Sequence, residues 1–231
     1  MEQFSRTEML IGKEKLSILK SKTVLIFGIG GVGSYVVESL ARCGIGTLIL
    51  VDNDVVSLSN INRQIIALHS TVGKPKVDVM KERILDINLD ANVICHQEFV
   101  SPENIDKFID KKIDYIVDAI DTVKSKIAII EKAKELDIPI ISSMGTGNKL
   151  DPLKFKITDI SKTSVCPLAK VIRKALKEKG IKKVKVLYSE EIPNKASDNS
   201  IEGKSVPASI AFVPSVAGLA ISGEVVKDLI K

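Results

Sequence analysis

The chain has 231 residues and a net charge of +5; 45% of its residues are hydrophobic and 27% are charged. These values suit one large α/β domain, or one domain with an appendage. The three cysteines, Cys43, Cys95 and Cys166, lie far apart and form no C-x-x-C pair, which argues against a disulfide framework or a cysteine-rich zinc site.

The chain shows no targeting or membrane signal. The N-terminal residues lack the apolar run of a signal peptide. The longest apolar stretch, residues 208–223, is interrupted by Pro214 and is shorter than the roughly 20 residues of a membrane-spanning helix. We therefore expect a cytoplasmic protein with no membrane partner.

Strands and helices are predicted to alternate through the first 145 residues. Short apolar, β-branched runs predict buried parallel strands over residues 22–27, 47–51, 93–100, 115–119 and 138–142. Helices are expected over residues 31–43, 76–88 and 122–136, and another is expected to begin at Ser101-Pro102-Glu103, with Ser101 as N-cap. This order is typical of an α/β fold with a Rossmann-like, doubly wound and mostly parallel sheet.

The pattern loosens after residue 150, where we expect a C-terminal extension that completes the core. The expected order is a strand over 155–158, a basic helix over 165–179, a strand over 183–187, a mobile loop over 191–207, a strand over 209–213 and a closing helix over 214–230. Residues 151–231 are interpreted as part of the same integrated domain as residues 1–150.

A glycine turn follows the first predicted strand. In GIGGVG, Gly28, Gly30, Gly31 and Gly33 permit a tight turn and allow backbone N–H groups to approach a phosphate at a helix N-terminus. Asp52 ends the second strand 19 residues after Gly33, where a carboxylate can accept hydrogen bonds from a ribose. Both features fit NAD, FAD or ATP, and they also fit a tight packing turn followed by an acid that caps a strand.

Three further charged residues favour ATP. Arg63 can bind phosphate with its planar guanidinium, and Lys76 opens a helix from which it can reach the same phosphates. Asp121 follows the strand over 115–119 and can hold the Mg²⁺ that accompanies ATP. Each could be a solvated surface charge, but convergence at one sheet edge predicts a nucleotide site.

Four ordered motifs carry a resemblance over roughly residues 5–145. GIGGVG, DNDVVSLSNINRQ, VGKPK and DAIDTVKSK resemble the adenylating domain of the ubiquitin-activating-enzyme superfamily, which includes the ThiF, MoeB and HesA proteins. The resemblance implies an ATP-binding, adenylating region over residues 1–150, with Asp52 on the ribose and Asp121 on Mg²⁺. It further implies a homodimer in which Arg6 enters the partner's ATP site. The remaining nucleotide residues would be Asp54, Asn60, Arg63, Gln64 and Lys76.

The second half narrows the resemblance. Residues 157–181 and 209–229 resemble the tRNA threonylcarbamoyladenosine dehydratases, the TcdA/CsdL group, which implies ATP-dependent cyclisation of the side-chain carboxylate of a modified adenosine in tRNA. One alternative is adenylation of the C-terminus of a small ubiquitin-like sulfur-carrier protein. The other is a non-catalytic NAD-binding or scaffold protein.

A basic stretch supports a nucleic-acid partner. Eight basic residues and one acid lie between Lys170 and Lys185. Four of them share one helical face, so they could neutralise tRNA phosphates; an ordinary solvated face is the alternative, and an acidic protein partner would also suit this face. The expected tRNA-binding residues are Lys170, Arg173, Lys174, Lys177, Lys182 and Lys183. Cys166 lies just before Pro167 at the start of this helix, where a thiolate could be stabilised, and its catalytic role is left open.

Overall fold

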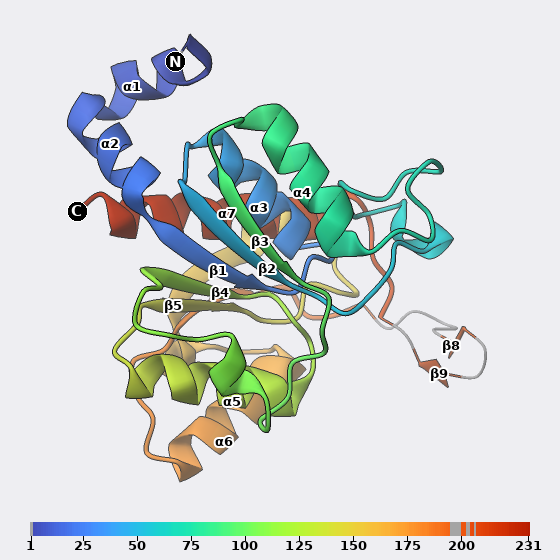
Figure 1. Cartoon of the computed structure of the whole chain (residues 1–231). Coiled ribbons are helices and arrows are strands. Elements are labelled where there is room, and N and C mark those ends of the chain that lie inside the picture. The colour runs from blue at the N-terminus through green and yellow to red at the C-terminus, as the bar shows by residue number, and fades with distance from the viewer. Residues whose placement is uncertain (1, 195–199, 202–203, 206) are drawn as a thin grey trace.

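A seven-stranded sheet forms the centre of the molecule (Figure 1). The computed structural model describes residues 2–194, 200–201, 204–205 and 207–231. The strand order is β3-β2-β1-β4-β5-β7-β6, and all neighbours pair in parallel except β6 and β7. The predicted doubly wound, mostly parallel α/β sheet is therefore confirmed. The strands are β1 (Thr23–Phe27), β2 (Thr47–Val51), β3 (Asn92–His96), β4 (Tyr115–Asp118), β5 (Ile140–Ser143), β6 (Phe155–Asp159) and β7 (Lys185–Ser189).

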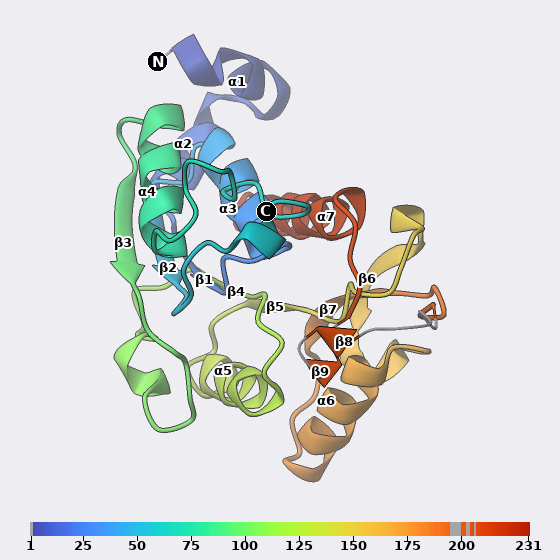
Figure 2. The same cartoon turned by 90° about the vertical axis from the view of Figure 1, so that its right-hand side faces the viewer.

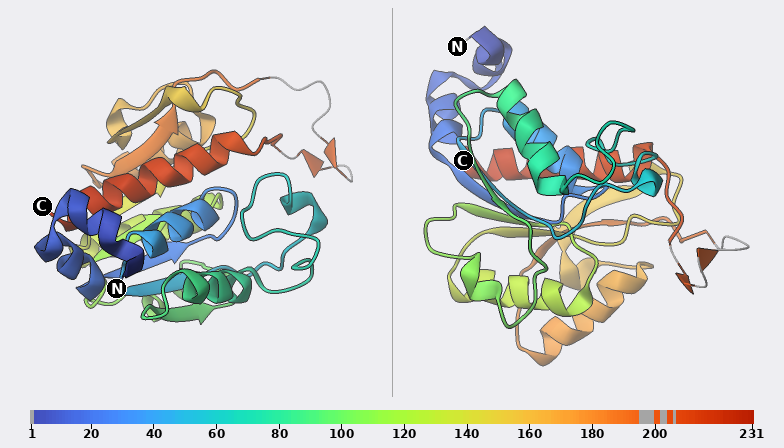
Figure 3. Two further views of the ribbon diagram at one scale, coloured as in Figure 1. Left: turned by 90° about the horizontal axis from the view of Figure 1, so that it is seen from above. Right: turned by 45° about the vertical axis from the view of Figure 1, so that its right-hand side comes forward.

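Helices cover both faces of this sheet (Figure 2). One face carries α3 (Gly33–Arg42), α4 (Lys76–Ile87) and α7 (Phe212–Leu229); the other carries α5 (Val123–Glu135) and α6 (Pro167–Glu178). The N-terminal helices α1 (Ser5–Ile11) and α2 (Lys13–Ser21) lie at one end, near the C-terminus (Figure 3). Short 3-10 turns are η1 (Glu2–Phe4), η2 (Leu58–Asn60), η3 (Ile105–Lys107), η4 (Pro152–Lys154) and η5 (Ile160–Lys162).

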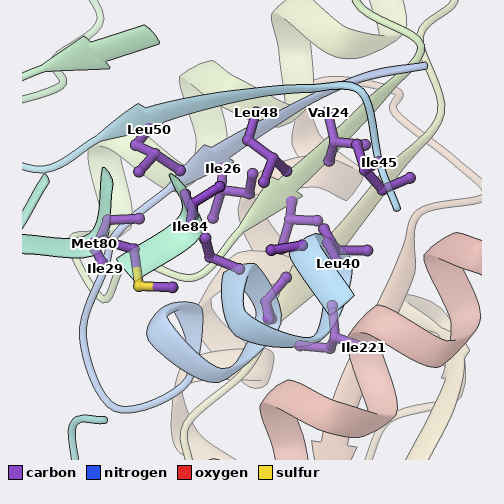
Figure 4. Packing of buried hydrophobic residues seen from close by; sticks show 14 of the residues in the cluster. Val24, Ile26, Ile29, Leu40, Ile45, Leu48, Leu50, Met80, Ile84 and Ile221 are labelled. Carbon is purple, nitrogen blue, oxygen red and sulfur yellow. The ribbon is translucent and has the colours of Figure 1, made fainter. Parts of the chain in front are cut away.

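The apolar strands produce one core on each face of the sheet. Alternate residues of a strand point to opposite faces, so Val24 and Ile26 of β1 join the cluster beneath α3 and α7, whereas Leu25 and Phe27 join the cluster against α5 and α6. The first cluster is filled by branched aliphatic side chains, including Ile221 of α7 (Figure 4). Burial on both faces explains why these strands are apolar throughout.

Two predicted elements are wrong. Instead of a helix starting at Ser101, the chain forms only the short η3, because the Asn104 side chain accepts the Ser101 N–H at 2.8 Å and closes a turn. The predicted strand over 209–213 is absent: residues 207–210 belong to no element, and α7 begins at Phe212. Pro214 lies in the first turn of α7, where its missing N–H has no helical acceptor to lose.

The predicted mobile loop over 191–207 is only partly described. Ser200–Ile201 (β8) and Lys204–Ser205 (β9) pair as antiparallel strands. Residues 195–199, 202–203 and 206 lie outside the described residues, so the mobility of this loop stays a prediction. Within the described chain, no helix combines the length and apolarity needed to span a bilayer.

The glycine turn after β1 brings three segments into backbone contact. A Cβ on Gly33 would lie 1.7 Å from the carbonyl oxygen of Gly28, so α3 can start directly above the turn only with glycine there. Gly28 itself has a φ of +86°, and a Cβ on it would lie 2.9 Å from the carbonyl oxygen of Ala119, just beyond β4. These glycines therefore fix the distance between the turns that follow β1 and β4.

We expect Gly33→Ala to destabilise the fold by at least the ~1–3 kcal/mol typical of overpacking, since the clash is with backbone. Chemical denaturation monitored by circular dichroism would measure the loss. Gly223→Ala in α7 is the matched control, because its Cβ would meet nothing within 4 Å, and it should be neutral or slightly stabilising. Equal stability of the two variants would contradict the packing role of Gly33.

Candidate functional site

A cavity of about 730 Å³ opens at the carboxyl ends of the central strands. Its walls come from the turns after β1, β2, β3, β4 and β5, the edge at which open parallel sheets bind ligands. Most of the residues that the sequence assigns to a nucleotide line this one cavity. They are Gly28, Gly30, Gly31, Asp52, Asp54, Asn60, Arg63, Gln64, Lys76 and Asp121.

Asp52 ties the glycine turn to the loop after β2. Its Oδ2 accepts the Ile29 N–H at 2.6 Å, and its Oδ1 accepts the Asp54 N–H at 2.8 Å. A carboxylate offers about four lone-pair positions, so both oxygens can accept further hydrogen bonds. The side chain is thus held at the end of β2 in a position to bind the hydroxyl groups of a ribose.

Arg63 is positioned by a short capped turn. Asn60 ends η2, and its Oδ1 accepts the Ser57 N–H at 3.1 Å, which closes a capping box. One terminal nitrogen of Arg63 donates to Ser59 O and to Asn62 Oδ1, each at 2.8 Å. The other donors of the guanidinium stay available to an anion in the cavity, next to the glycine turn.

Lys76 is paired with Asp54. The Lys76 side chain is only 6% exposed, and its Nζ lies 2.7 Å from Asp54 Oδ2. The sequence places both residues at the nucleotide but does not predict this ion pair. A phosphate entering the cavity would compete with Asp54 for the ammonium group, which sits on the first residue of α4.

Gln64 carries a buried acceptor for which the described residues provide no donor. Its residue is 6% exposed, and its Oε1 has no hydrogen-bond partner among the described residues. A buried amide oxygen without a donor costs free energy, so such an atom at a cavity wall is a sign of a ligand group that completes it.

Asp121 fits a role in holding Mg²⁺. Its exposed carboxylate lines the cavity and takes part in no ion pair with any described residue. Among the residues that the structure describes, no three His, Cys, Asp or Glu side chains converge into an all-protein metal site. Mg²⁺ at nucleotide sites is commonly held by one or two carboxylates together with phosphates, and this donor set is of that kind.

A buried ion pair beneath the cavity was missed by the sequence analysis. Asp118 and Lys126 are both fully buried, and Lys126 Nζ lies 2.9 Å from Asp118 Oδ2. Lys126 Nζ also donates to Ile120 O at 2.9 Å, and Ser142 Oγ donates to Asp118 Oδ2 at 2.6 Å. Both charged residues belong to the motif DAIDTVKSK, whose spacing of eight residues does not reveal that they meet. The pair fixes the turn that carries Asp121.

Further cavity walls were also missed. Phe99 and Val100 follow β3, and the turn over 144–147 follows β5. Leu168 adds an apolar contact from the start of α6. These residues are apolar or small, with no charge pattern to mark them. Only the order of strands in the sheet indicates that these turns lie beside the nucleotide residues.

Several predicted site residues lie elsewhere. Gly33 does not line the cavity and serves the packing described above. Arg6 is exposed on α1, a helix with no buried residue, and does not line the cavity of its own chain. Five of the predicted tRNA-binding residues are exposed around α6: Lys170, Lys174, Lys177, Lys182 and Lys183. The sixth, Arg173, donates hydrogen bonds to the backbone O and to the Oγ1 of Thr163.

Cys166 lies behind the cavity wall. Its residue is 4% exposed, and its sulfur lies 3.8 Å from the position of a Cβ on Gly145. Burial lowers the pKa of the neighbouring Lys149, an effect that Cys166 and Glu191 oppose. Burial raises the pKa of Cys43, and that of Cys95 to about 11, so neither side chain readily forms a thiolate near neutral pH.

Known proteins resemble this chain along its whole length. The ThiF family profile matches residues 4–231. A tRNA threonylcarbamoyladenosine dehydratase of Bacillus subtilis is 49% identical over 243 aligned residues, covering 100% of this chain and 96% of that protein. The crystal structure of the Escherichia coli tRNA N6-threonylcarbamoyladenosine dehydratase with AMP is 33% identical, has a TM-score of 0.92, and is matched over 99% of this chain and 94% of that one. A second structure of the E. coli enzyme, in complex with ATP, gives a TM-score of 0.91 at the same identity and coverage.

Lys126→Met should destabilise the protein by about 3–5 kcal/mol, because it leaves the Asp118 carboxylate buried and unpaired. Lys107→Met removes an exposed partner of Glu98 and should cost no more than about 1 kcal/mol, so it is the control. In urea denaturation, the double variant Asp118→Asn/Lys126→Met should be more stable than Lys126→Met alone. If Lys126→Met lost as little stability as the Lys107→Met control, the pair would not be important for the fold.

Proposed function

Because this chain belongs to the ThiF family, we propose that its cavity binds ATP and activates a carboxylate as an acyl adenylate. The enzyme is an ATP-dependent tRNA-modifying dehydratase, and its substrate is threonylcarbamoyladenosine in tRNA. The observation that carries the proposal is the convergence of Asp52, Arg63 and Lys76 in one cavity, beside a glycine turn with close backbone packing. Asp52 would hold the ribose, and the two cations would hold the triphosphate.

The first step activates the substrate carboxylate, which is a poor electrophile. An oxygen of the substrate carboxylate attacks the α-phosphorus of ATP, and pyrophosphate leaves. Arg63 and Lys76 would offset the charge that builds up on the leaving pyrophosphate, a contribution of positioning and electrostatics. Mg²⁺, held by Asp121, would neutralise phosphate charge when it is bound.

The second step is intramolecular. A nucleophile within the same modified side chain attacks the acyl carbon, its proton is lost, and the bond to AMP breaks. The net change is the loss of one water from the substrate, whose oxygen leaves in AMP. Because nucleophile and electrophile belong to one side chain, no cysteine of the enzyme is required, and burial of Cys166 is compatible with that.

We further propose a homodimer that completes each site with Arg6 of the second protomer. In support, α1 buries none of its side chains within its own chain, and Met9 and Leu10 on it are each 85% exposed. A second copy could cover these apolar side chains and receive the neighbouring Arg6 into its cavity. An arginine supplied from another protomer can stabilise charge in the transition state.

The exposed lysines around α6 are the proposed tRNA contact. Lys170, Lys174 and Lys177 share one face of α6, and Lys182 and Lys183 follow it. Leu168, at the start of the same helix, lines the cavity, so a tRNA bound along α6 would lie beside the site of reaction. Arg173, tied to Thr163, would contribute less than its sequence position suggests. A tRNA substrate also favours a cytoplasmic location.

ATP–pyrophosphate exchange, with each candidate substrate added separately, tests this function. We expect exchange and AMP formation with tRNA that carries threonylcarbamoyladenosine, and none with the same tRNA lacking the modification. Stimulation only by a carrier protein ending in Gly-Gly would overturn the tRNA assignment in favour of the sulfur-carrier alternative.

Arg63→Ala should abolish AMP formation, and Arg6→Ala should do the same if the arginine acts in the partner's site. Mixing the two inactive variants should restore activity, because one site of each mixed dimer then has both arginines. Random exchange of protomers predicts about a quarter of the wild-type rate. A mixture that stays inactive, although co-purification of differently tagged protomers shows mixed dimers, would exclude Arg6 acting in the partner's site.

Replacing Lys174 and Lys177 by glutamine should weaken tRNA binding and reduce its dependence on salt, with ATP affinity nearly unchanged, because two phosphate contacts are lost. Fluorescence anisotropy across a salt titration measures both effects. Lys111→Gln/Lys112→Gln removes the same charge from another exposed turn and is the matched control. Identical salt slopes for the two double variants would show that α6 does not contact tRNA.

A further inference from the structure

We propose that the turn after β5, residues 144–147, binds the reacting carboxyl group of the substrate. In this assignment its backbone N–H groups donate to the carboxyl oxygen that becomes negatively charged during the reaction. The inference rests on the proposed function, and it identifies the part of the same cavity that binds the substrate carboxyl group, which we call the acceptor side.

The turn lies in the cavity but away from the nucleotide residues. Met144, Gly145, Thr146 and Gly147 all line it. In the sheet, β5 is separated from β1 by β4 alone, so the strands that lead into this turn and into the glycine turn lie about 10 Å apart, two strand spacings of ~4.8 Å. That separation leaves room for a small acyl group between them, above the turn that carries Asp121.

Three successive N–H groups of the turn have no acceptor among the described residues. The N–H of Met144 donates to Leu187 O at 2.8 Å, and that of Asn148 donates to Ala208 O at 2.7 Å. Between them, the N–H groups of Gly145, Thr146 and Gly147 bind no oxygen of any described residue. A run of free backbone N–H groups at a cavity wall is an anion-binding arrangement.

The turn is hydrogen-bonded at both ends. Ser142, just before it, donates to the buried Asp118 at 2.6 Å. Asn148, just after it, has a φ of +59°, and its Oδ1 accepts the Ala208 N–H at 2.8 Å. Donors that are fixed before the reaction need no reorganisation when charge develops, which is the property required of an oxyanion site.

The direction of attack points to the same turn. Arg63 and Lys76 lie after β2 and at the start of α4, so the leaving pyrophosphate is drawn to that side of the cavity. In an in-line displacement the attacking and leaving oxygens lie on opposite sides of the phosphorus. The carboxylate must then approach from the side of β4 and β5, where the turn over 144–147 provides the free N–H groups.

The second step uses the same donors. When the internal nucleophile bonds to the acyl carbon, the electron pair of the C=O bond moves onto its oxygen. The N–H groups of the turn stabilise that oxyanion. The carbonyl then re-forms, the bond to AMP breaks, and the proton of the nucleophile passes to solvent. The turn thus serves both steps without any side-chain chemistry of its own.

Replacement of single backbone N–H groups by ester oxygens tests the subsite. An α-hydroxy acid incorporated at position 146 or 147 removes that N–H and leaves the side chain unchanged. We expect each ester variant to lower the kcat of tRNA-dependent AMP formation by about 10²-fold or more, with the KM for ATP within twofold of wild type. The same ester at Lys111, whose exposed N–H also lacks an acceptor among the described residues, is the control.

A substitution that spares these N–H groups adds a second measurement. Asn148→Gly keeps the left-handed backbone and the backbone hydrogen bond to Ala208 O but removes the Oδ1 that accepts the Ala208 N–H, so it should lower kcat less than the esters do. Ester variants at 146 and 147 that both match the Lys111 control would overturn the subsite while leaving the proposed function intact. A wild-type protein that forms no AMP with modified tRNA would overturn the proposed function, and the subsite with it.

Discussion

The contact between the glycine turn and the start of the turn after β4 sets the geometry of the whole site. Because Gly28 and Gly33 lack side chains, the backbone of β1 can turn sharply, α3 can start above it, and the carbonyl of Ala119 can pack against it. Every other part of the cavity is arranged around this contact. Asp52, at the end of β2, accepts the Ile29 N–H and so connects the glycine turn to β2. The Asp118–Lys126 pair connects the turn after β4 to β5 through the hydrogen bond from Ser142.

Two kinds of interaction hold the cavity walls. On the nucleotide side, a polar contact such as the Lys76–Asp54 pair joins a buried cation to a carboxylate that is 57% exposed, so a ligand can replace the exposed partner. On the acceptor side, the chain is fixed by the buried Ser142–Asp118 contact at one end and by the exposed Asn148–Ala208 contact at the other, and the groups without a described acceptor are backbone N–H groups. The first arrangement suits a nucleotide that must enter and leave, and the second suits a short-lived charge that needs prepared donors.

The charged half of the site could be predicted from sequence, because charge is unusual at the ends of buried strands. Asp52, Arg63, Lys76 and Asp121 stood out for that reason, and the cavity contains all four. The turn over 144–147 could not be predicted, since its function would depend on the backbone and on strand order. Phe212 shows a different difficulty: a short apolar run before a proline fits a strand and a helix start equally well, and only packing of α7 on α3 decides.

The buried Asp118–Lys126 pair restricts how this chain can change over time. A substitution at either position alone leaves the other charge buried and unpaired. When both residues are to be replaced one after the other, the first replacement therefore produces a poorly folded protein. Neutral drift at these two positions is therefore expected to be blocked unless both codons change nearly together or a third residue compensates first. Because the pair also supports the turn carrying Asp121, a lineage that lost it would need another way to hold that turn. Such a history would be visible among relatives as replacement of residues 118 and 126 together.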